Sequence, residues 1–68
     1  MSEILFLVEQ AQEGGFTARS MSESIFTEAD TLPELRKMVQ DAVHCHFEES
    51  AMPKIIRLHI VQEEMLAA

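Results

Sequence analysis

The residues best suited to chemistry are three histidines and a single cysteine. His44, Cys45 and His46 are consecutive, and imidazole and thiolate are ligands that suit zinc or copper. Neighbouring residues of a helix point about 100° apart, so these three side chains cannot converge on one ion. His46 and His59 could approach each other, but no full tetrahedral set is visible. We therefore predict no metal and no cofactor, with His46 packed on the core and His44 facing water.

Catalysis by Cys45 would need a base within hydrogen-bond reach and a pocket for a substrate. We expect Cys45 late on a helix, as a lone buried or half-buried thiol, which fits a reducing cytoplasm. The carboxylate pairs Glu48–Glu49 and Glu63–Glu64 are typical of solvated surface in so acidic a chain. A dehydrogenase assignment has no support, because the chain lacks a glycine-rich phosphate loop. The sequence therefore predicts that the protein is not an enzyme.

Charge and hydropathy narrow the possible partners further. The chain has twelve Asp and Glu residues and five Lys and Arg residues, which gives a net charge of −7. The basic residues are scattered along the chain. Direct nucleic-acid binding needs clustered Lys and Arg side chains, so we expect no direct binding to nucleic acid. The chain shows no signal peptide and no apolar run of membrane-spanning length, which predicts a soluble cytoplasmic protein. The acidity favours a basic protein partner through electrostatic steering, or simply keeps a small protein in solution.

Hydrophobic periodicity predicts four strands and one helix within a single domain, residues 1–68. The apolar run Ile4–Val8 is typical of a central strand buried on both faces. Shorter strands are expected at Phe16–Ser20 and Ser24–Glu28, and a fourth at Lys54–Val61. One apolar stripe predicts a helix from Leu32 to about Phe47 or Glu48.

Two local motifs fix the ends of these elements. Gly14 and Gly15 permit positive φ and so predict a hairpin between the first two strands. Thr31 and Glu34 form a capping box, in which each side chain can satisfy the other residue's backbone N–H at the start of the helix. Pro33 lies in the first turn, where its missing N–H costs nothing.

The order β-β-β-α-β predicts an α+β fold in which one helix covers one face of a four-stranded mixed sheet. A hairpin, a second hairpin and a helical crossover give the sheet order 3-2-1-4. One helix leaves the other face open, and four apolar side chains should emerge there, namely Leu5, Leu7, Ile55 and Val61. Such a patch usually marks an interface, so we expect a homo-dimer or a larger oligomer. The alternative is a register one residue away, which would place these side chains inside.

Two segments carry a resemblance to the HicB antitoxin family. Glu13-Gly14-Gly15-Phe16 is similar to the acidic-Gly-Gly-aromatic hairpin of that family. After a short strand, Ala29-Asp30-Thr31-Leu32-Pro33-Glu34 resembles the "G-D-T-L-E-E" start of its helix. The resemblance spans roughly residues 3 to 61.

This resemblance implies the toxin-neutralising domain of HicB, a partial RNase-H-like fold that forms dimers or tetramers and occludes a small basic ribonuclease toxin of the HicA type. Two departures limit the expectation. Ser22-Glu23-Ser24 replaces the family's usual Pro-containing segment before the third strand, and no DNA-binding domain follows. We therefore expect a stand-alone member that does not bind DNA, either a toxin-binding module or a structural or accessory assembly domain without a toxin partner. The metal-binding acids of an active RNase H are missing, since Ile4–Val8 contains none.

Overall fold

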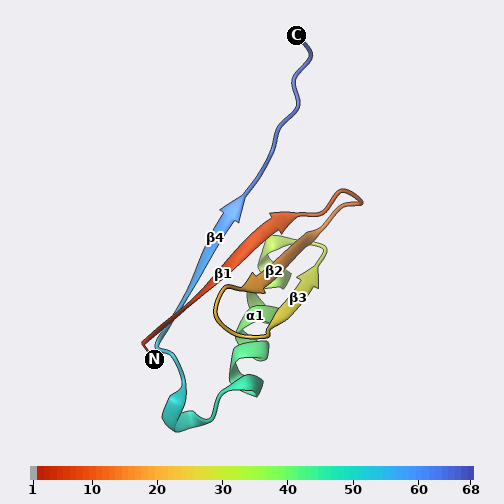
Figure 1. Ribbon diagram of the computed structural model, residues 1–68. Coiled ribbons are helices and arrows are strands. Elements are labelled where there is room, and N and C mark those ends of the chain that lie inside the picture. Colours follow the sequence, from red (N-terminus) through yellow and green to blue (C-terminus); the bar gives the residue numbers. More distant parts are fainter. Residues whose placement is uncertain (1) are drawn as a thin grey trace.

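The computed structural model describes residues 2–68 and shows the predicted order of elements. In chain order these are β1 (Glu3–Gln10), β2 (Phe16–Ser20), β3 (Phe26–Ala29), α1 (Leu32–His46), the short 3-10 turn η1 (Glu49–Ala51) and β4 (Ile55–Val61). The strands form one sheet with the order β3-β2-β1-β4, and α1 packs on one of its faces (Figure 1). β1 runs antiparallel to β2 and parallel to β4, so the predicted fold class and sheet order are confirmed.

The core is a single layer between α1 and one face of the sheet, to which β1 contributes most. Alternate residues of β1 point into it, and Ile4, Phe6 and Val8 are buried. From the helix, Leu35, Val39 and Val43 meet them at the spacing of one helical face. The expectation that β1 is buried on both faces is wrong, because a single helix can cover only one face of the sheet.

The start of α1 follows the predicted cap in part. Thr31 is extended, and its Oγ1 accepts a hydrogen bond from the Glu34 N–H at 3.3 Å. In the described part of the chain, the Glu34 carboxylate makes no reciprocal bond to the Thr31 N–H. The cap therefore rests on one side-chain bond, with Pro33 in the first turn.

The hairpin between β1 and β2 turns on its two glycines. Gly14 has φ +102° and Gly15 has φ +80°, as predicted from their sequence. The Ala11 N–H donates to the Gly15 carbonyl at 3.0 Å, and the Gly14 N–H donates to the Ala11 carbonyl at 3.1 Å. These bonds bring Phe16 opposite Gln10 and set the register of the whole antiparallel pair.

The third strand starts later than expected, at Phe26 instead of Ser24. The Ser20 Oγ accepts hydrogen bonds from the N–H groups of Ser22 (3.3 Å) and Glu23 (3.0 Å), which holds the preceding residues in a turn. Ile25 then follows this turn with its side chain buried in the core.

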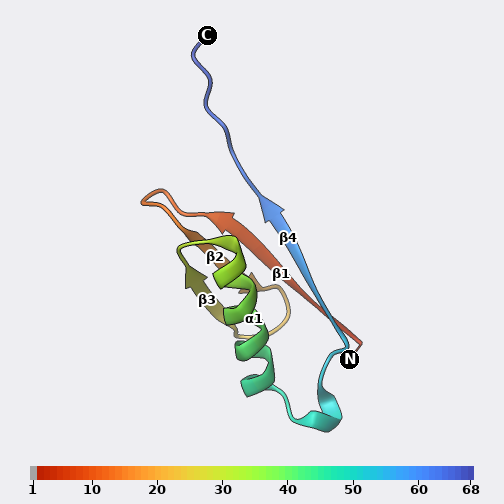
Figure 2. The same ribbon diagram turned by 180° about the vertical axis from the view of Figure 1, so that it is seen from behind.

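The helix lies over β2 and β3, and β4 runs outside its cover (Figure 2). Beyond β4, residues Gln62–Ala68 continue away from the body as an extended segment, here called the tail (Figure 1). No helix among residues 2–68 is long and apolar enough to cross a membrane.

Candidate interaction surface

The sheet face away from α1, here called the open face, carries all four predicted interface residues. Leu5 is 38% exposed, Ile55 52% and Val61 40%, while Leu7 is half-buried. Their even-numbered neighbours in β1 are the buried core residues, so the register shifted by one residue is ruled out. The structure brings Leu5 and Leu7 together on β1, whereas Ile55 and Val61 lie at opposite ends of β4.

Two further apolar side chains extend this patch, and the sequence reasoning missed both. Phe26 of β3 pairs with Arg19 of β2, which pairs with Leu7 of β1, so all three lie on the open face. The Met21 N–H donates to the Leu5 carbonyl at 3.0 Å, which places Met21 beside Leu5. Phe26 is 62% exposed and Met21 57%. The alternation of side chains along paired strands could have predicted that Phe26 lies on the open face.

Charged groups on the open face are arranged around this patch. The Arg57 Nε donates to Glu3 Oε2 at 2.9 Å, and its Nη2 donates to Glu3 Oε1 at 3.0 Å. This hydrogen-bonded guanidinium holds the pKa of the Glu3 carboxyl below its ordinary value, and the carboxylate in turn raises the pKa of Arg57. Arg19 and His59 flank Leu7 on its two neighbouring strands. The open face is therefore an apolar patch bordered by charged side chains of both signs, with Arg19 and Arg57 on one hand and Glu3 and Glu9 on the other.

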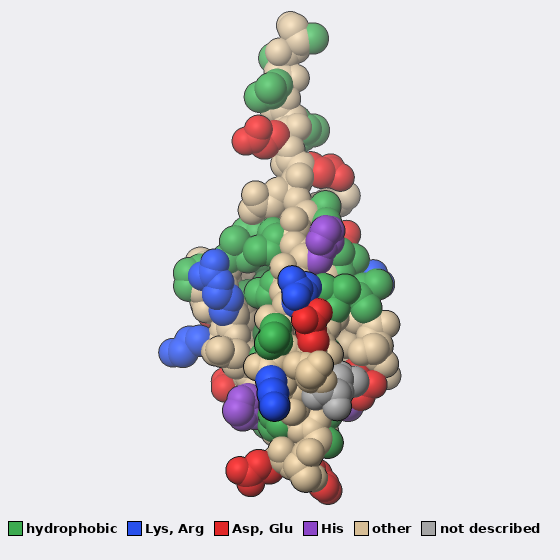
Figure 3. Space-filling model, turned by 90° about the vertical axis from the view of Figure 1, so that its left-hand side faces the viewer, with side chains coloured by type: hydrophobic (Ala, Val, Ile, Leu, Met, Phe, Trp, Pro, Cys, Tyr) green, Lys and Arg blue, Asp and Glu red, His purple; other side chains and the backbone are tan. Residues whose placement is uncertain are grey.

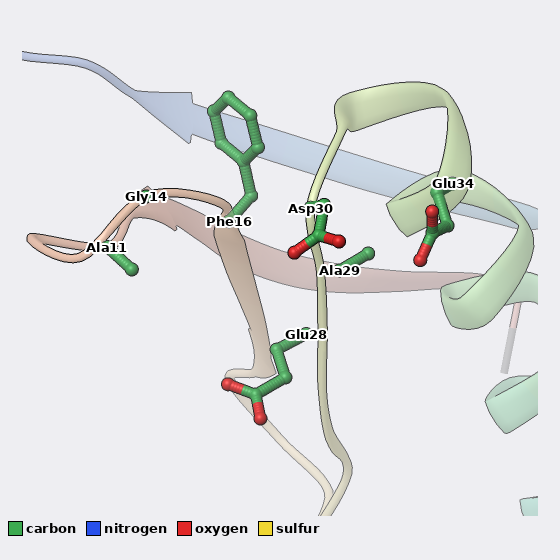
Figure 4. A pocket seen from close by; sticks show the side chains of 7 residues that line it. All are labelled: Ala11, Gly14, Phe16, Glu28, Ala29, Asp30 and Glu34. Carbon is green, nitrogen blue, oxygen red and sulfur yellow. The ribbon is translucent and has the colours of Figure 1, made fainter.

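A hollow of about 350 Å³ lies at the end of the sheet where β3 runs into α1. Figure 4 shows Asp30 between Phe16 and Glu34, with Glu28 further along β3. The hollow is open and acidic. Within residues 2–68, no three His, Cys, Asp or Glu side chains are grouped so that they could hold a metal ion.

Among residues 2–68, the histidines and the cysteine do not come together in one site. His46 does not pack on the core as predicted: it is exposed, and its Nε2 lies 3.2 Å from Glu23 Oε1. The burial pattern explains this, because the buried stripe of α1 ends at Val43 and the last turn extends past the sheet (Figure 2). Cys45, expected to be buried or half-buried, is exposed. His59 lies on the open face, across the sheet from α1, so the predicted possibility of a His46–His59 pair is wrong.

A second, smaller hollow of about 180 Å³ separates α1 from β4. It is lined by Val39, Gln40 and Arg36 of the helix and by Ile56 and Leu58 of the strand. Because α1 leans toward β2 and β3, the helix-side residues of β4 are only partly covered.

Comparison with known proteins gives two relatives that share most of the chain. A UPF0150 protein of Archaeoglobus fulgidus is 54% identical over 52 residues, which cover 76% of this chain and 77% of the relative. A UPF0150 protein of Thermotoga maritima is 40% identical over 65 residues, covering 96% of this chain and 91% of the relative. No family model and no solved structure matches the chain.

Proposed function

The chain belongs to the UPF0150 family, and we propose that it works as a non-enzymatic protein-interaction module that assembles with a second copy through the open face of its sheet. The observation that carries this proposal is the exposed apolar patch of Leu5, Leu7, Met21 and Phe26. Exposed patches of this kind usually mark a protein interface.

The size of the domain supports self-association. A single core in a chain this short supplies only a few kcal/mol of stability, and oligomerisation is a common addition. The one cysteine is exposed, so no internal disulfide adds to the core. Burying the open face against a second copy would extend the hydrophobic core beyond the layer between β1 and α1.

The resemblance to HicB suggests the nature of a second partner. Under this proposal the assembled protein, in the cytoplasm, binds a small basic protein of the HicA toxin type and neither nucleic acid nor membrane. Its net charge of −7 suits such a partner through electrostatic steering. The carboxylates of Glu28, Asp30 and Glu34 line the hollow beside β3, so part of this negative charge lies at one end of the sheet.

The alternative is a structural or accessory domain that assembles without any toxin. Such a domain would assemble through the same open face. The two candidate functions therefore differ only in whether the assembled protein also binds a toxin. We would isolate the tagged protein from its native cells and determine the intact mass and the composition of the assembly by mass spectrometry. A small basic protein held at fixed stoichiometry supports the antitoxin-type role, whereas recovery of the protein alone as a discrete oligomer supports the accessory role.

The interface itself is tested by placing a charge on the open face. We expect Leu7→Glu to reduce the number of copies per assembly, because burying a carboxylate at the centre of the patch costs free energy even with Arg19 beside it. Ile55→Glu should act in the same direction. Asp41→Asn, on the exposed side of α1, is the control. A folded Leu7→Glu variant with the mass of the unmodified assembly would rule out the open face as the interface.

A further inference from the structure

We propose that β4 and the tail pair antiparallel with the same segment of a second copy, about a two-fold axis at Ile60, so that two four-stranded sheets become one. This interface uses the outer edge of β4. It is separate from the open-face contact and does not depend on it.

The outer edge of β4 is long and unprotected. β4 is an edge strand of seven residues, whereas the other edge, β3, has only four. The Ile55 N–H donates to the Ser2 carbonyl at 3.0 Å on the β1 side. By alternation, the backbone groups of Ile56, Leu58 and Ile60 point outward, and nothing within residues 2–68 pairs with them. An edge of this kind is a template for another strand.

Figure 3 views this edge directly. A strip of backbone descends from the tail at the top, and apolar side chains lie on both sides of it. Ile55, Ile60 and Val61 of β4 are among the exposed apolar residues of the protein. Backbone groups for a ladder and apolar surface for packing therefore lie along the same line.

The apolar side chains of the tail are exposed in the single chain. Met65 is 96% exposed and Leu66 86%, although both side chains are apolar. The radius of gyration is 13.3 Å, against roughly 11 Å for a compact domain of this length, because the tail projects from the body. An apolar extension in line with an open strand edge is suited to contact a neighbouring chain.

The charges of this segment identify the neighbour as a second copy. Lys54 immediately precedes the segment and Arg57 lies in its first half, whereas Glu63 and Glu64 follow its strand. Antiparallel pairing of two such segments places the basic half of each beside the acidic half of the other. Parallel pairing would place like charges side by side, which is unfavourable.

The two faces of the sheet fix the register. Helix-side residues must meet helix-side residues, so each residue pairs with one of the same parity. With Ile60 opposite Ile60, Arg57 faces Glu63 and Ile55 faces Met65 of the second copy. Moving the axis to His59 would place Ile55 opposite Glu63 and leave Arg57 opposite Val61. The axis at Ile60 therefore matches both the charges and the apolar residues.

The first test compares Ile60→Pro with Ile60→Thr. Both variants lose the Ile side chain, but only proline removes the outward N–H at the axis, a change that an edge strand tolerates within its own sheet. By native mass and light scattering, we expect Ile60→Pro to halve the mass of the assembly, and Ile60→Thr to retain it. A folded Ile60→Pro variant of unchanged mass, or an unmodified protein that is monomeric at micromolar concentration, would overturn the proposal.

The second test starts from a substitution in the tail, which leaves the sequence of β4 unchanged. Glu63→Arg places like charges opposite Arg57 twice per dimer, and we expect the dimer Kd to rise about tenfold. Asp41→Arg makes the same change in net charge on α1 and should leave the Kd unchanged. Arg57 also pairs with Glu3 of its own chain, so the charge exchange combines Glu63→Arg and Arg57→Glu with Glu3→Gln, and we expect this variant to restore the dimer. Equal effects of Glu63→Arg and Asp41→Arg, or no restoration, would reject this pairing.

The two interfaces can be told apart because Leu7 lies on β1, away from the β4 edge. If the β4 edge is an interface and the open face is not, Leu7→Glu should leave the mass of the assembly unchanged, whereas Ile60→Pro should still halve it. If the open face is an interface and the β4 edge is not, the two variants should show the opposite pattern.

Discussion

Arg57 and Glu3 form a doubly hydrogen-bonded ion pair between β4 and β1, although 54 residues separate them in sequence. The pair lies on the open face and spans the only parallel contact in the described sheet. It therefore joins the last strand to the first at the point where the helix gives β4 little cover.

This pair predicts a specific dependence of stability on pH. The pKa of Glu3 is lowered in the folded protein, chiefly by its hydrogen bond to Arg57. The stabilisation is therefore complete above the carboxyl's ordinary pKa and is lost as the pH falls through the lowered value. We expect Glu3→Gln to lower the melting temperature slightly at neutral pH and to match the unmodified protein in strong acid. The effect is small because the pair is exposed. Thermal unfolding across this pH range tests it, with Glu48→Gln as the control; a constant difference at all pH values would contradict it.

The cap at Thr31 predicts a loss of stability on removal of its oxygen. Thr31→Ala leaves the Glu34 N–H without its side-chain acceptor and should lower the free energy of unfolding by about 1 kcal/mol. Thr31→Ser keeps the hydroxyl and should behave like the unmodified protein. Chemical denaturation measures both. Equal losses in the two variants would mean that the methyl group, not the hydrogen bond, stabilises the helix start.

The two hairpin glycines should respond differently to alanine. Both have positive φ, which costs an alanine roughly 1–2 kcal/mol. A Cβ on Gly14 would meet open space, whereas a Cβ on Gly15 would lie 2.8 Å from the backbone oxygen of Ala29. We therefore expect Gly15→Ala to destabilise the protein more than Gly14→Ala, as measured by urea unfolding. The reverse order would show that the hairpin can move away from β3 at little cost.

The distribution of cations predicts that the protein does not bind DNA. Arg19 and Arg57 lie on the open face, whereas Arg36 lies beside the hollow on the helix side, so the basic groups do not form one stripe. With a net charge of −7, we expect no binding to a duplex at micromolar protein and physiological salt. Fluorescence anisotropy with a labelled duplex measures this, and submicromolar affinity would contradict it.

The fold was predictable because its signals are local and point to one arrangement. The cap at Thr31 located the start of α1, and the glycine pair located the first hairpin. The open face was predictable for Leu5 and Leu7 once a single helix had to cover the other side.

The remaining errors came from features that depend on the position of α1 over the sheet. The continuous run from Ile4 to Val8 gives no alternation and by itself indicates burial on both faces, although Leu5 is 38% exposed. Similarly, His46 continues the helical stripe by spacing, but the last turn extends past the strands and the side chain meets Glu23 instead. Helical periodicity identifies a face of the helix and does not show where the sheet beneath it ends.

The pairing of β1 with β4 also has a consequence for synthesis on the ribosome. Glu3 pairs with Ile55, so the central strand emerges early and must wait for about 50 further residues before its parallel neighbour exists. Until then, one backbone edge of this apolar strand has no hydrogen-bonded neighbour. Contacts between such distant segments also slow folding after release. The nascent chain therefore carries an unpaired edge on its central apolar strand until β4 has been made, and pairing with β4 is the step that closes this edge.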